Sequence, residues 1–371
     1  MGRRAWTQEG RGLLPCRAAH SARCRRRPRR RRQLTAAHRP SVRDALAGCS
    51  ERRDVTMKTL DVEALSLDQR YRFADELGRG GFGVVYRATA VDGGEDVAIK
   101  LFAPRDGANN ELSQRLFNRG AMLAKQLDAP GFVEVREVGE DLERGPYMVM
   151  ECLEGETLRS RLAREPLTVS ESILLAYTLA EILVGAHSQG VVHRDLKPCN
   201  LMLVGPQQDE LRVLDLGIAT LSAEWRSESF ETLTQYSCFV GSPCYLAPEC
   251  VPGHDPHGLK ASPRVDVYAW GLILLECLTG ETAVQGNNVL KILAEQVRPR
   301  PVPIPEVWVE SKLGPLLRHA LAKDPQQRLA SAVELVERLR PLMGDLSWIP
   351  EVGRPGCVGR VDEETLPPMS E

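Results

Sequence analysis

One short polar segment near the middle of the chain constrains its fold more than any other feature. Residues 193–200 read HRDLKPCN, and residues 215–217, which begin fifteen positions further on, read DLG. An acid, a lysine two residues later and an amide five residues later are thus followed by a second acid. Chance would rarely place so many fixed residue types in register, so we expect a fold that brings both segments to one site.

The residue types in these two segments suit the transfer of a phosphoryl group. Asp195 can accept or orient a hydroxyl proton, and Lys197 can offset charge on the transferring group. Asn200 and Asp215 supply the oxygen ligands that magnesium prefers. Each residue alone is more often a capping or turn residue, but the set together favours the catalytic interpretation. His193 is expected to be a packed structural histidine, because the acid of the pattern is Asp195.

A glycine-rich segment lies about a hundred residues earlier. Residues 78–85 read GRGGFGVV, which has the spacing G-x-G-x-x-G-x-V. A dinucleotide-binding fingerprint requires a helix directly after the glycines, whereas residues 84–88 read VVYRA and should continue as a strand. A hairpin that lies over phosphate groups therefore fits better. The alternative is a plain β-turn.

A single lysine interrupts the next apolar strand. Residues 97–100 read VAIK, and Lys100 follows Gly83 by seventeen residues. Lysines on strands usually extend to solvent. A strand lysine at this distance from a glycine-rich turn can instead reach the α- and β-phosphates of a nucleotide, and we favour that interpretation.

The beginning of the chain differs sharply in charge from the remainder. Residues 1–56 hold sixteen arginines and four acidic residues, a net charge of +12, whereas the rest of the chain carries −14. Such self-repelling charge predicts a disordered segment. A solvated tail, a nucleic-acid-binding arm, a transit peptide and a translation start at Met57 all remain open, with the tail and the later start favoured. Nucleic acid is expected as a partner only through this segment, and is not favoured there.

The cysteine spacing and the hydropathy pattern predict the cellular location of the protein. None of the ten cysteines forms a C-x-x-C pair or a metal-ligand spacing, which predicts a reducing compartment. No run approaches about twenty apolar residues. The two most apolar runs, 173–186 and 265–278, contain Glu181 and Glu276 and are expected to be core helices. We therefore expect no membrane span and a cytoplasmic protein.

The order of the expected elements predicts an α+β fold with two lobes. Strand composition is found at 71–78, 84–91, 96–102, 132–138 and 147–152, with a tight turn at Gly93-Gly94. Residues 110–127 have the periodicity of one long helix, and the pattern from Leu158 onward is mostly helical up to a last helix over 331–342. The expected divisions are a disordered segment 1–56, a linker 57–70, lobes 71–152 and 153–343, and a flexible acidic tail 344–371.

From residue 71 to about residue 343 the chain resembles the protein kinase family, since all these motifs occur in the order found there. It is most similar to soluble bacterial relatives of the eukaryotic serine/threonine kinases. The lysine two residues after Asp195 is typical of the serine/threonine type. The resemblance implies the bilobal kinase fold, with a β-rich N-lobe containing one long helix and a mainly helical C-lobe. It also implies transfer of the γ-phosphoryl group of ATP, with Mg²⁺, to protein Ser or Thr hydroxyls.

The resemblance carries over to individual residues. It implies Asp195, Lys197 and Lys100 as catalytic residues and Asn200 and Asp215 as metal ligands. It further implies that Met150 is the gatekeeper and that the backbone of the two following residues contacts adenine. The implied nucleotide contacts are Leu77, Gly78, Arg79, Gly80, Gly81, Phe82, Gly83, Val84, Val85, Ala98, Lys100, Met150, Glu151 and Cys152.

The second half of the chain also carries features of the family. Residues 241–249 read GSPCYLAPE and resemble the segment that closes a kinase activation loop and supports the peptide substrate. Arg328 is expected to be the buried partner of Glu249, which would stabilise the helical lobe. Asp266 is expected to brace the backbone of the catalytic loop.

One position departs from the family pattern. A glutamate on the long helix usually pairs with the strand lysine, but residues 117–121 read FNRGA and place Gly120 at that position. Lys100 would then be less restrained, and a glycine inside a helix costs about 1 kcal/mol relative to alanine. An ATP-binding regulatory pseudokinase, or a kinase that depends on a partner, therefore remains an alternative to an active enzyme.

Arg194 suggests control by a phosphorylated activation loop, because an arginine beside the catalytic acid can pair with an added phosphate. Hydroxyl acceptors occur between Gly217 and Gly241. Thr234 and Ser237 are preferred among them, because they lie nearest the closing end of the loop. Autophosphorylation at these residues is the expected route of activation.

Overall fold

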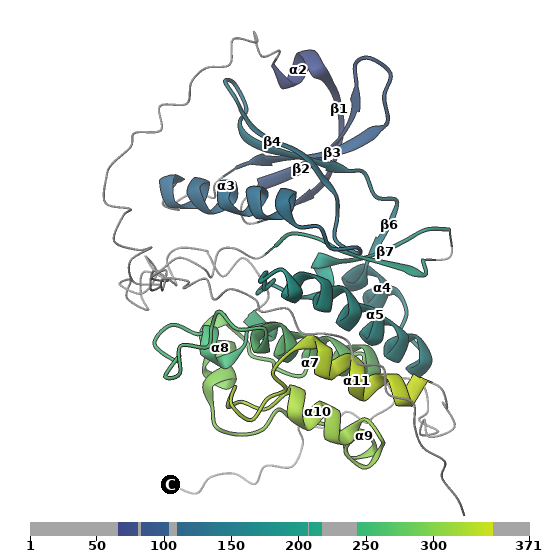
Figure 1. Cartoon of the computed structure of the whole chain (residues 1–371), viewed down its shortest axis with the longest axis vertical. Coiled ribbons are helices and arrows are strands. Elements are labelled where there is room, and N and C mark those ends of the chain that lie inside the picture. Colours follow the sequence, from purple (N-terminus) through teal and green to yellow (C-terminus); the bar gives the residue numbers. More distant parts are fainter. Residues whose placement is uncertain (1–65, 81–82, 104–109, 207, 217–242, 344–371) are drawn as a thin grey trace, which may run out of the picture. The chain divides into compact units, whose positions relative to one another are not determined.

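The computed structural model describes residues 66–80, 83–103, 110–206, 208–216 and 243–343. The expectations for residues 1–56, Gly81, Phe82, the activation-loop hydroxyls and the acidic tail lie outside these ranges. Within the described residues a β-sheet lobe is followed along the chain by a mainly helical lobe, as the sequence predicts (Figure 1).

The first lobe is an antiparallel sheet of five strands in the order β1-β2-β3-β5-β4. The strands are β1 (Tyr71–Arg79), β2 (Gly83–Ala90), β3 (Asp96–Phe102), β4 (Val135–Asp141) and β5 (Gly145–Glu151). The turn from β2 to β3 contains Gly93 at a φ of 83°, a conformation that glycine adopts without strain. This confirms the predicted hairpin.

Strand β4 begins and ends three residues later than predicted. Phe132 forms an isolated bridge with Val213 instead of joining the sheet, and the Val133 N–H donates to the Val213 oxygen at 3.0 Å. These residues therefore tie the end of the sheet lobe to a strand about eighty residues later. A composition pattern cannot distinguish the two pairings, because both partners are distant in sequence.

The two faces of the sheet pack against different helices. Val97, Ile99 and Leu101 of β3 lie on one face, in a cluster that includes Leu67. Ala98 lies on the other face with Phe117 of helix α3 (Asn110–Gln126). Because side chains alternate along a strand, Lys100 belongs to the α3 side.

The described fold begins earlier than the expected boundary at residue 71. Helix α2 (Leu67–Arg70) buries Leu67 to 1% exposure, and the Leu67 N–H donates to Asp141 Oδ2 at 2.8 Å. Arg70 forms an ion pair with Glu137 of β4. The last residues of the predicted linker 57–70 thus close one face of the sheet. A single turn of helix is too short for hydrophobic periodicity to reveal it.

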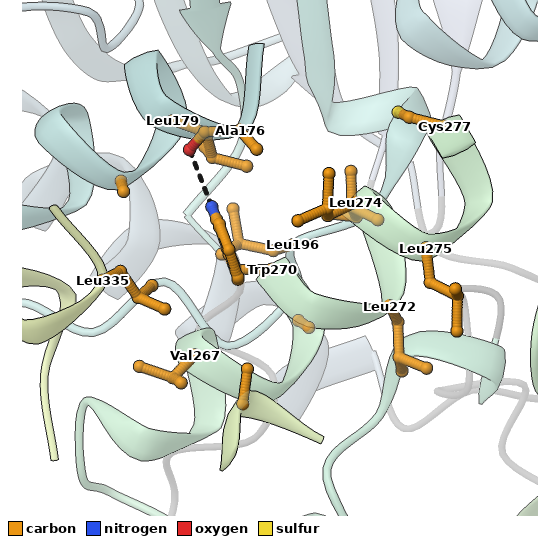
Figure 2. Close-up of a cluster of buried hydrophobic side chains, with 14 of the residues drawn as sticks. Ala176, Leu179, Leu196, Val267, Trp270, Leu272, Leu274, Leu275, Cys277 and Leu335 are labelled. Carbon is orange, nitrogen blue, oxygen red and sulfur yellow. Dashed lines mark hydrogen bonds between the residues drawn. The ribbon is translucent and has the colours of Figure 1, made fainter. Parts of the chain in front are cut away.

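The helical lobe is built around two long apolar helices. Its helices are α4 (Leu158–Arg164), α5 (Val169–Ser188), α7 (Arg264–Thr279), α8 (Val289–Val297), α9 (Glu306–Glu310), α10 (Gly314–Ala320) and α11 (Ala332–Met343). Helix α5 packs against both α7 and α11. Figure 2 shows Trp270 of α7 among buried leucines, with its indole N–H donating to the Ala176 oxygen of α5 at 2.8 Å.

Helix α5 is long and apolar enough to cross a membrane by length and composition, the one such helix in the described ranges. The core helix of a water-soluble domain passes the same test. Its residues Ile173, Leu179 and Leu183 are fully buried in the main hydrophobic cluster. This arrangement fits the expected core helix, and the residues of the second apolar run lie equally buried in α7.

A small sheet inside the helical lobe was not predicted. It has the strand order β6-β7-β8, with β6 (Gly155–Thr157), β7 (Leu201–Val204) and β8 (Glu210–Val213). Strands of three or four residues carry too little alternation to stand out from a helical background. This sheet nevertheless positions the first polar segment, residues 193–200, and the start of the second, residues 215–216.

Candidate active site

The β7–β8 hairpin brings the two polar segments together. Leu201 pairs with Val213 in the hairpin, so Asn200 directly precedes one strand and Leu214 directly follows the other. The Leu214 N–H donates to the Asn200 oxygen at 2.8 Å. One hydrogen bond therefore joins two residues that are fourteen positions apart in the sequence, and Asp215 directly follows the second of them.

Asp195 lies at the centre of a compact polar cluster. Lys197 Nζ donates to Asp195 Oδ2 at 2.6 Å, and the Asn200 amide donates to the same oxygen at 3.1 Å and to the Asp195 backbone oxygen at 2.8 Å. The Asp195 side chain stays 37% exposed, whereas that of Lys197 is 8% exposed. Lys197 and Asn200 therefore fix the orientation of the Asp195 carboxylate, which remains accessible to a substrate.

Lys100 forms an ion pair with Asp215. Lys100 Nζ lies 2.6 Å from Asp215 Oδ1, and the lysine is 9% exposed. Burial alone would raise the pKa of the Asp215 carboxyl, but the charge of Lys100 and its hydrogen bond to the carboxylate, with a smaller contribution from Lys197, outweigh this effect, so the pKa is lowered. Asp215 adopts a φ of 44°, which is unusual for a residue with a side chain. The carboxylate therefore stays ionised and aimed at the strand lysine.

A buried aspartate on α7 holds the catalytic loop by its backbone. Asp266 accepts hydrogen bonds from the His193 N–H at 2.8 Å and the Arg194 N–H at 2.7 Å, which confirms the predicted brace. His193 is fully buried and its Nε2 lies 2.9 Å from the Leu214 oxygen, as expected of a structural histidine. His187 Nε2 also lies 2.9 Å from Asp266 and was not anticipated, because its helix carries no local signal for it.

The described part of the glycine-rich turn explains one of its glycines, Gly83. A Cβ at Gly83 would lie 2.1 Å from the Leu101 backbone oxygen, so only glycine allows this approach of β2 to β3. The Gly80 N–H donates to the Gly83 oxygen at 2.8 Å and closes the turn. A Cβ at Gly78 would meet open space. Leu77, beside it, is 47% exposed, which leaves this surface accessible to a ligand.

The expected adenine contacts lie on neighbouring strands. Ala98 of β3 pairs with Met150 of β5, and both are buried beside Phe117. The Glu151 N–H donates to the Glu134 oxygen at 3.0 Å. A backbone contact from Glu151 to adenine would therefore have to come from its carbonyl group.

Comparison with known proteins identifies the family. The sequence model described as "Protein kinase domain" matches residues 71–338. The chain belongs to the protein kinase family. Its fold is also similar to the crystal structure of Rad53 1-466 in complex with AMP-PNP, with a TM-score of 0.58 at 20% identity over 74% of this chain and 66% of that one. The bilobal kinase fold expected from the sequence is confirmed.

The kinase is similar to bacterial serine/threonine-protein kinases. It is 32% identical to pkn2 of Myxococcus xanthus over 302 residues, which cover 80% of this chain and 35% of the relative. It is also 32% identical to PknB of Mycobacterium tuberculosis over 275 residues, covering 72% and 42%. The chain thus spans less than half the length of these curated relatives.

Within this kinase the strand lysine lacks a partner on α3 and uses Asp215 instead. Gly120 occupies the middle of α3. Glu111, the acid nearest the start of that helix, pairs with Arg115 at 2.6 Å. The ion pair of Lys100 therefore links β3 to the segment after β8, and α3 carries no side chain that adds to it in the described ranges.

The segment that closes the activation loop is held by two clusters of charged residues. Arg328 binds Glu249 through both nitrogens, at 2.6 and 3.1 Å, and both side chains are at most 1% exposed, which confirms the predicted pair. Glu276 of α7 accepts hydrogen bonds from the Tyr245 hydroxyl and from Arg159 of α4, the latter at 2.8 Å. This second cluster was missed, because its members come from three distant parts of the chain.

Arg194 is a partly buried cation of the catalytic loop. It adopts a φ of 67°, and its Nε is buried without a hydrogen-bond partner among the described residues. Burial lowers the pKa of Arg194, and the nearby charge of Arg119 on α3 lowers it further. The charge of a side chain on α3 therefore acts on an arginine of the catalytic loop.

Proposed function

We propose that this chain is a serine/threonine protein kinase that transfers the γ-phosphoryl group of ATP to hydroxyl groups of proteins. The observation that carries the proposal is the convergence of Asp195, Lys197 and Asn200 in one hydrogen-bonded cluster, directly joined to the Asp215–Lys100 ion pair. The similarity to bacterial serine/threonine kinases supports the same reaction.

The roles follow from the contacts. Asp195, oriented by Lys197 and Asn200 and partly exposed, would accept the proton of the Ser or Thr hydroxyl as its oxygen bonds to phosphorus. The bond from phosphorus to the leaving oxygen of ADP then breaks. Lys197 would offset the negative charge that develops on the phosphoryl group, and Lys100 would bind the phosphates that remain on ADP.

The donor set of the site fits magnesium. Asp215 offers a carboxylate kept ionised by its lowered pKa, and Asn200 offers an amide oxygen, since its NH₂ group is used by Asp195. The described residues contain no group of three or more His, Cys, Asp or Glu side chains placed to hold a metal. Nucleotide phosphates would complete the coordination, as is common for this ion. Mg²⁺ would supply neutralisation of phosphate charge when bound.

The nucleotide itself would lie along the sheet. We infer contacts from the glycine-rich turn, Leu77 to Val85, and from Ala98 and Lys100 on β3. Met150, Glu151 and Cys152 at the end of β5 would border the adenine. The AMP-PNP complex of the structurally similar Rad53 supports nucleotide binding by this fold.

Autophosphorylation with radiolabelled ATP and Mg²⁺ tests the proposal. The wild type is expected to label itself and a Ser/Thr-rich protein substrate, whereas Asp195→Ala is expected to lose at least about 10²-fold in rate. Lys100→Ala should also be strongly impaired. Nucleotide binding without any transfer by the wild type would instead favour the regulatory pseudokinase.

Control by the activation loop is part of the proposal. The Nε of Arg194 is buried without a partner among the described residues, and a loop phosphate could supply one, since charge-assisted hydrogen bonds to phosphate are strong. We propose Thr234 and Ser237 as the acceptors. Mass spectrometry of an ATP-treated active preparation should find phosphate on at least one of them, and two unmodified residues would contradict this part.

The free cysteines of the described residues bear on the cellular location. The described cysteines are free thiols, namely Cys152, Cys199, Cys244, Cys250 and Cys277. Free thiols suit a reducing compartment, so we propose a cytoplasmic location with protein substrates as partners. The divisions at residues 56, 152 and 343 are retained as the proposed domain organisation, and the division at residue 70 moves to residue 66, because α2 packs on the sheet.

A further inference from the structure

The cluster of Arg159, Tyr245 and Glu276 has no part in the reaction steps above. Arg159 Nη1 donates to Glu276 Oε1 at 2.8 Å, and its other terminal nitrogen donates to the Tyr245 hydroxyl. The Tyr245 hydroxyl in turn donates to the second oxygen of Glu276. One guanidinium, one phenol and one carboxylate thus form a closed triangle of hydrogen bonds.

The cluster lies beside the place where a peptide would bring its hydroxyl. Arg159 is in α4, which packs against the catalytic-loop turn η1 (Pro198–Asn200). Tyr245 belongs to η4 (Pro243–Tyr245), in the segment that resembles the support for the peptide substrate. Arg159 thus links the helix that packs on the catalytic-loop turn to the segment that resembles the peptide support.

The two charges of the cluster differ greatly in accessibility. The Glu276 side chain is 3% exposed, whereas that of Arg159 is 42% exposed. Tyr245 is also buried, at 4% exposure, and the guanidinium lies 6.0 Å from the centre of its ring. A peptide at this surface meets the cation and is separated by it from the carboxylate.

We propose that Arg159 is a specificity-determining residue that favours peptides with acidic side chains near the acceptor hydroxyl and rejects peptides with basic ones. The inference rests on the proposed protein kinase activity. An acidic side chain can share the exposed edge of the guanidinium, whereas a lysine or arginine meets a like charge. Arg159 also forms an ion pair with Glu276. Without this partner the carboxylate of Glu276 would attract a basic side chain of a peptide.

Three peptides test the proposal on the full chain. They share one serine and differ only at the three positions on each side of it, which are all Asp, all Ala or all Arg. For the wild type we expect kcat/KM to be at least about tenfold higher with the acidic than with the basic peptide. In Arg159→Ala the carboxylate of Glu276 is uncovered, and the preference should reverse. An unchanged ratio in Arg159→Ala would overturn the proposal.

Two further variants keep the test decisive. Removing Arg159 alone leaves a buried carboxylate without its cation and could unfold the lobe. The double variant Arg159→Met/Glu276→Gln removes both charges, and it should phosphorylate the acidic and basic peptides equally; retained acidic preference would contradict the role of Arg159. Arg164→Ala removes an arginine of the same helix that is 56% exposed and paired with Glu156, and its ratio should match the wild type.

The neutral peptide separates this inference from the proposed function. If the wild type phosphorylates the alanine peptide but treats the acidic and basic peptides alike, only the role of Arg159 is wrong. If it phosphorylates none of the three peptides and fails to label itself, the protein kinase activity is wrong and the inference is overturned with it.

Discussion

The two lobes of this kinase secure their essential charges in different ways. In the helical lobe, Arg328 binds Glu249 through two hydrogen bonds, with both side chains at most 1% exposed. In the sheet lobe, Lys100 makes one short contact with Asp215, whose side chain is 40% exposed. The first pair is sealed inside protein, whereas the second is accessible from solvent at one end.

The difference shows which charges are structural and which are available for chemistry. Glu249 is sealed from solvent and holds residues 243–249 on the helical lobe through Arg328. Asp215 is both the partner of Lys100 and a candidate ligand of Mg²⁺, so a metal-bound nucleotide must compete for it. With Gly120 on α3, the described part of the sheet lobe offers Lys100 no second carboxylate during that exchange.

Breaking the buried pair should give the largest loss of stability. Arg328→Ala leaves the Glu249 carboxylate buried without its cation, which typically costs 3–5 kcal/mol in free energy of unfolding. Urea denaturation followed by circular dichroism measures the change. Arg298→Ala is the matched control, because it breaks an exposed pair with Glu295 and should cost less than about 1 kcal/mol. Equal effects of the two substitutions would remove the contrast between the lobes.

Breaking the accessible pair should affect activity far more than stability. Lys100→Met keeps the length of the side chain and removes the charge that would bind phosphate. We expect a loss of about 10²-fold in kcat/KM for ATP, as for other single groups that stabilise developing charge. The free energy of unfolding should change by less than about 1 kcal/mol, because Asp215 is partly solvated.

A lysine elsewhere on the sheet lobe provides the control for that result. Lys125 is exposed near the end of α3. Lys125→Met should leave both kcat/KM for ATP and the free energy of unfolding at the wild-type level. A large loss of stability in Lys100→Met would mean that its ion pair is structural, like that of Arg328, and would contradict the comparison.

Adding a carboxylate to α3 should make the charge of Lys100 as firmly held as that of Arg328 in the helical lobe. Gly120→Glu is expected to raise the rate of autophosphorylation by up to about tenfold, because a second partner would restrain Lys100 when Asp215 binds metal. Gly120→Ala is the matched control: it gains about 1 kcal/mol of helix stability without a carboxylate. Equal rates for the two variants would show that helix propensity, and not the ion pair, limits the enzyme.

The sequence predicted the residues of short motifs better than the contacts made between distant elements. Asp266 as a brace and the Glu249–Arg328 pair were expected, because both belong to segments with characteristic residue order. The partner of Lys100 was not foreseen, since it depends on how the β7–β8 hairpin turns back toward β3. The hairpin itself has strands of four residues, which carry little periodic signal.

The cluster of Arg159, Tyr245 and Glu276 was also not predictable from the sequence. Arg159, Tyr245 and Glu276 are separated by 86 and 31 residues along the chain, and each has an ordinary local role as a helix or turn residue. Only tertiary packing places one guanidinium over one buried carboxylate. The expected start of order at Tyr71 was late for a similar reason, because Leu67 is recognisable as a core residue only through the sheet face that it covers.

The smallest expected effect concerns a second cation next to Arg328. Lys323 Nζ donates to the backbone oxygens of Glu295 and Gln296 at 3.2 and 3.0 Å, and both cations lie over the ring of Tyr268. Burial, with a further contribution from Arg328, lowers the pKa of Lys323 to about 8. Between that pH and about 10.5, its usual value, the unfolded chain binds the extra proton.

This difference makes the contribution of Lys323 to stability increase with pH. Below about pH 8 both states carry the charge and its burial penalty is constant, whereas above pH 8 the folded state releases the proton first. From pH 7 to pH 9.5 the wild type should gain about 1 kcal/mol relative to Lys323→Met, after allowance for partial exposure. Urea denaturation of both proteins at the two pH values measures this gain. A constant difference would mean that the backbone oxygens around Lys323 stabilise its charge fully, so that the helical lobe buries this cation as securely as it buries Arg328.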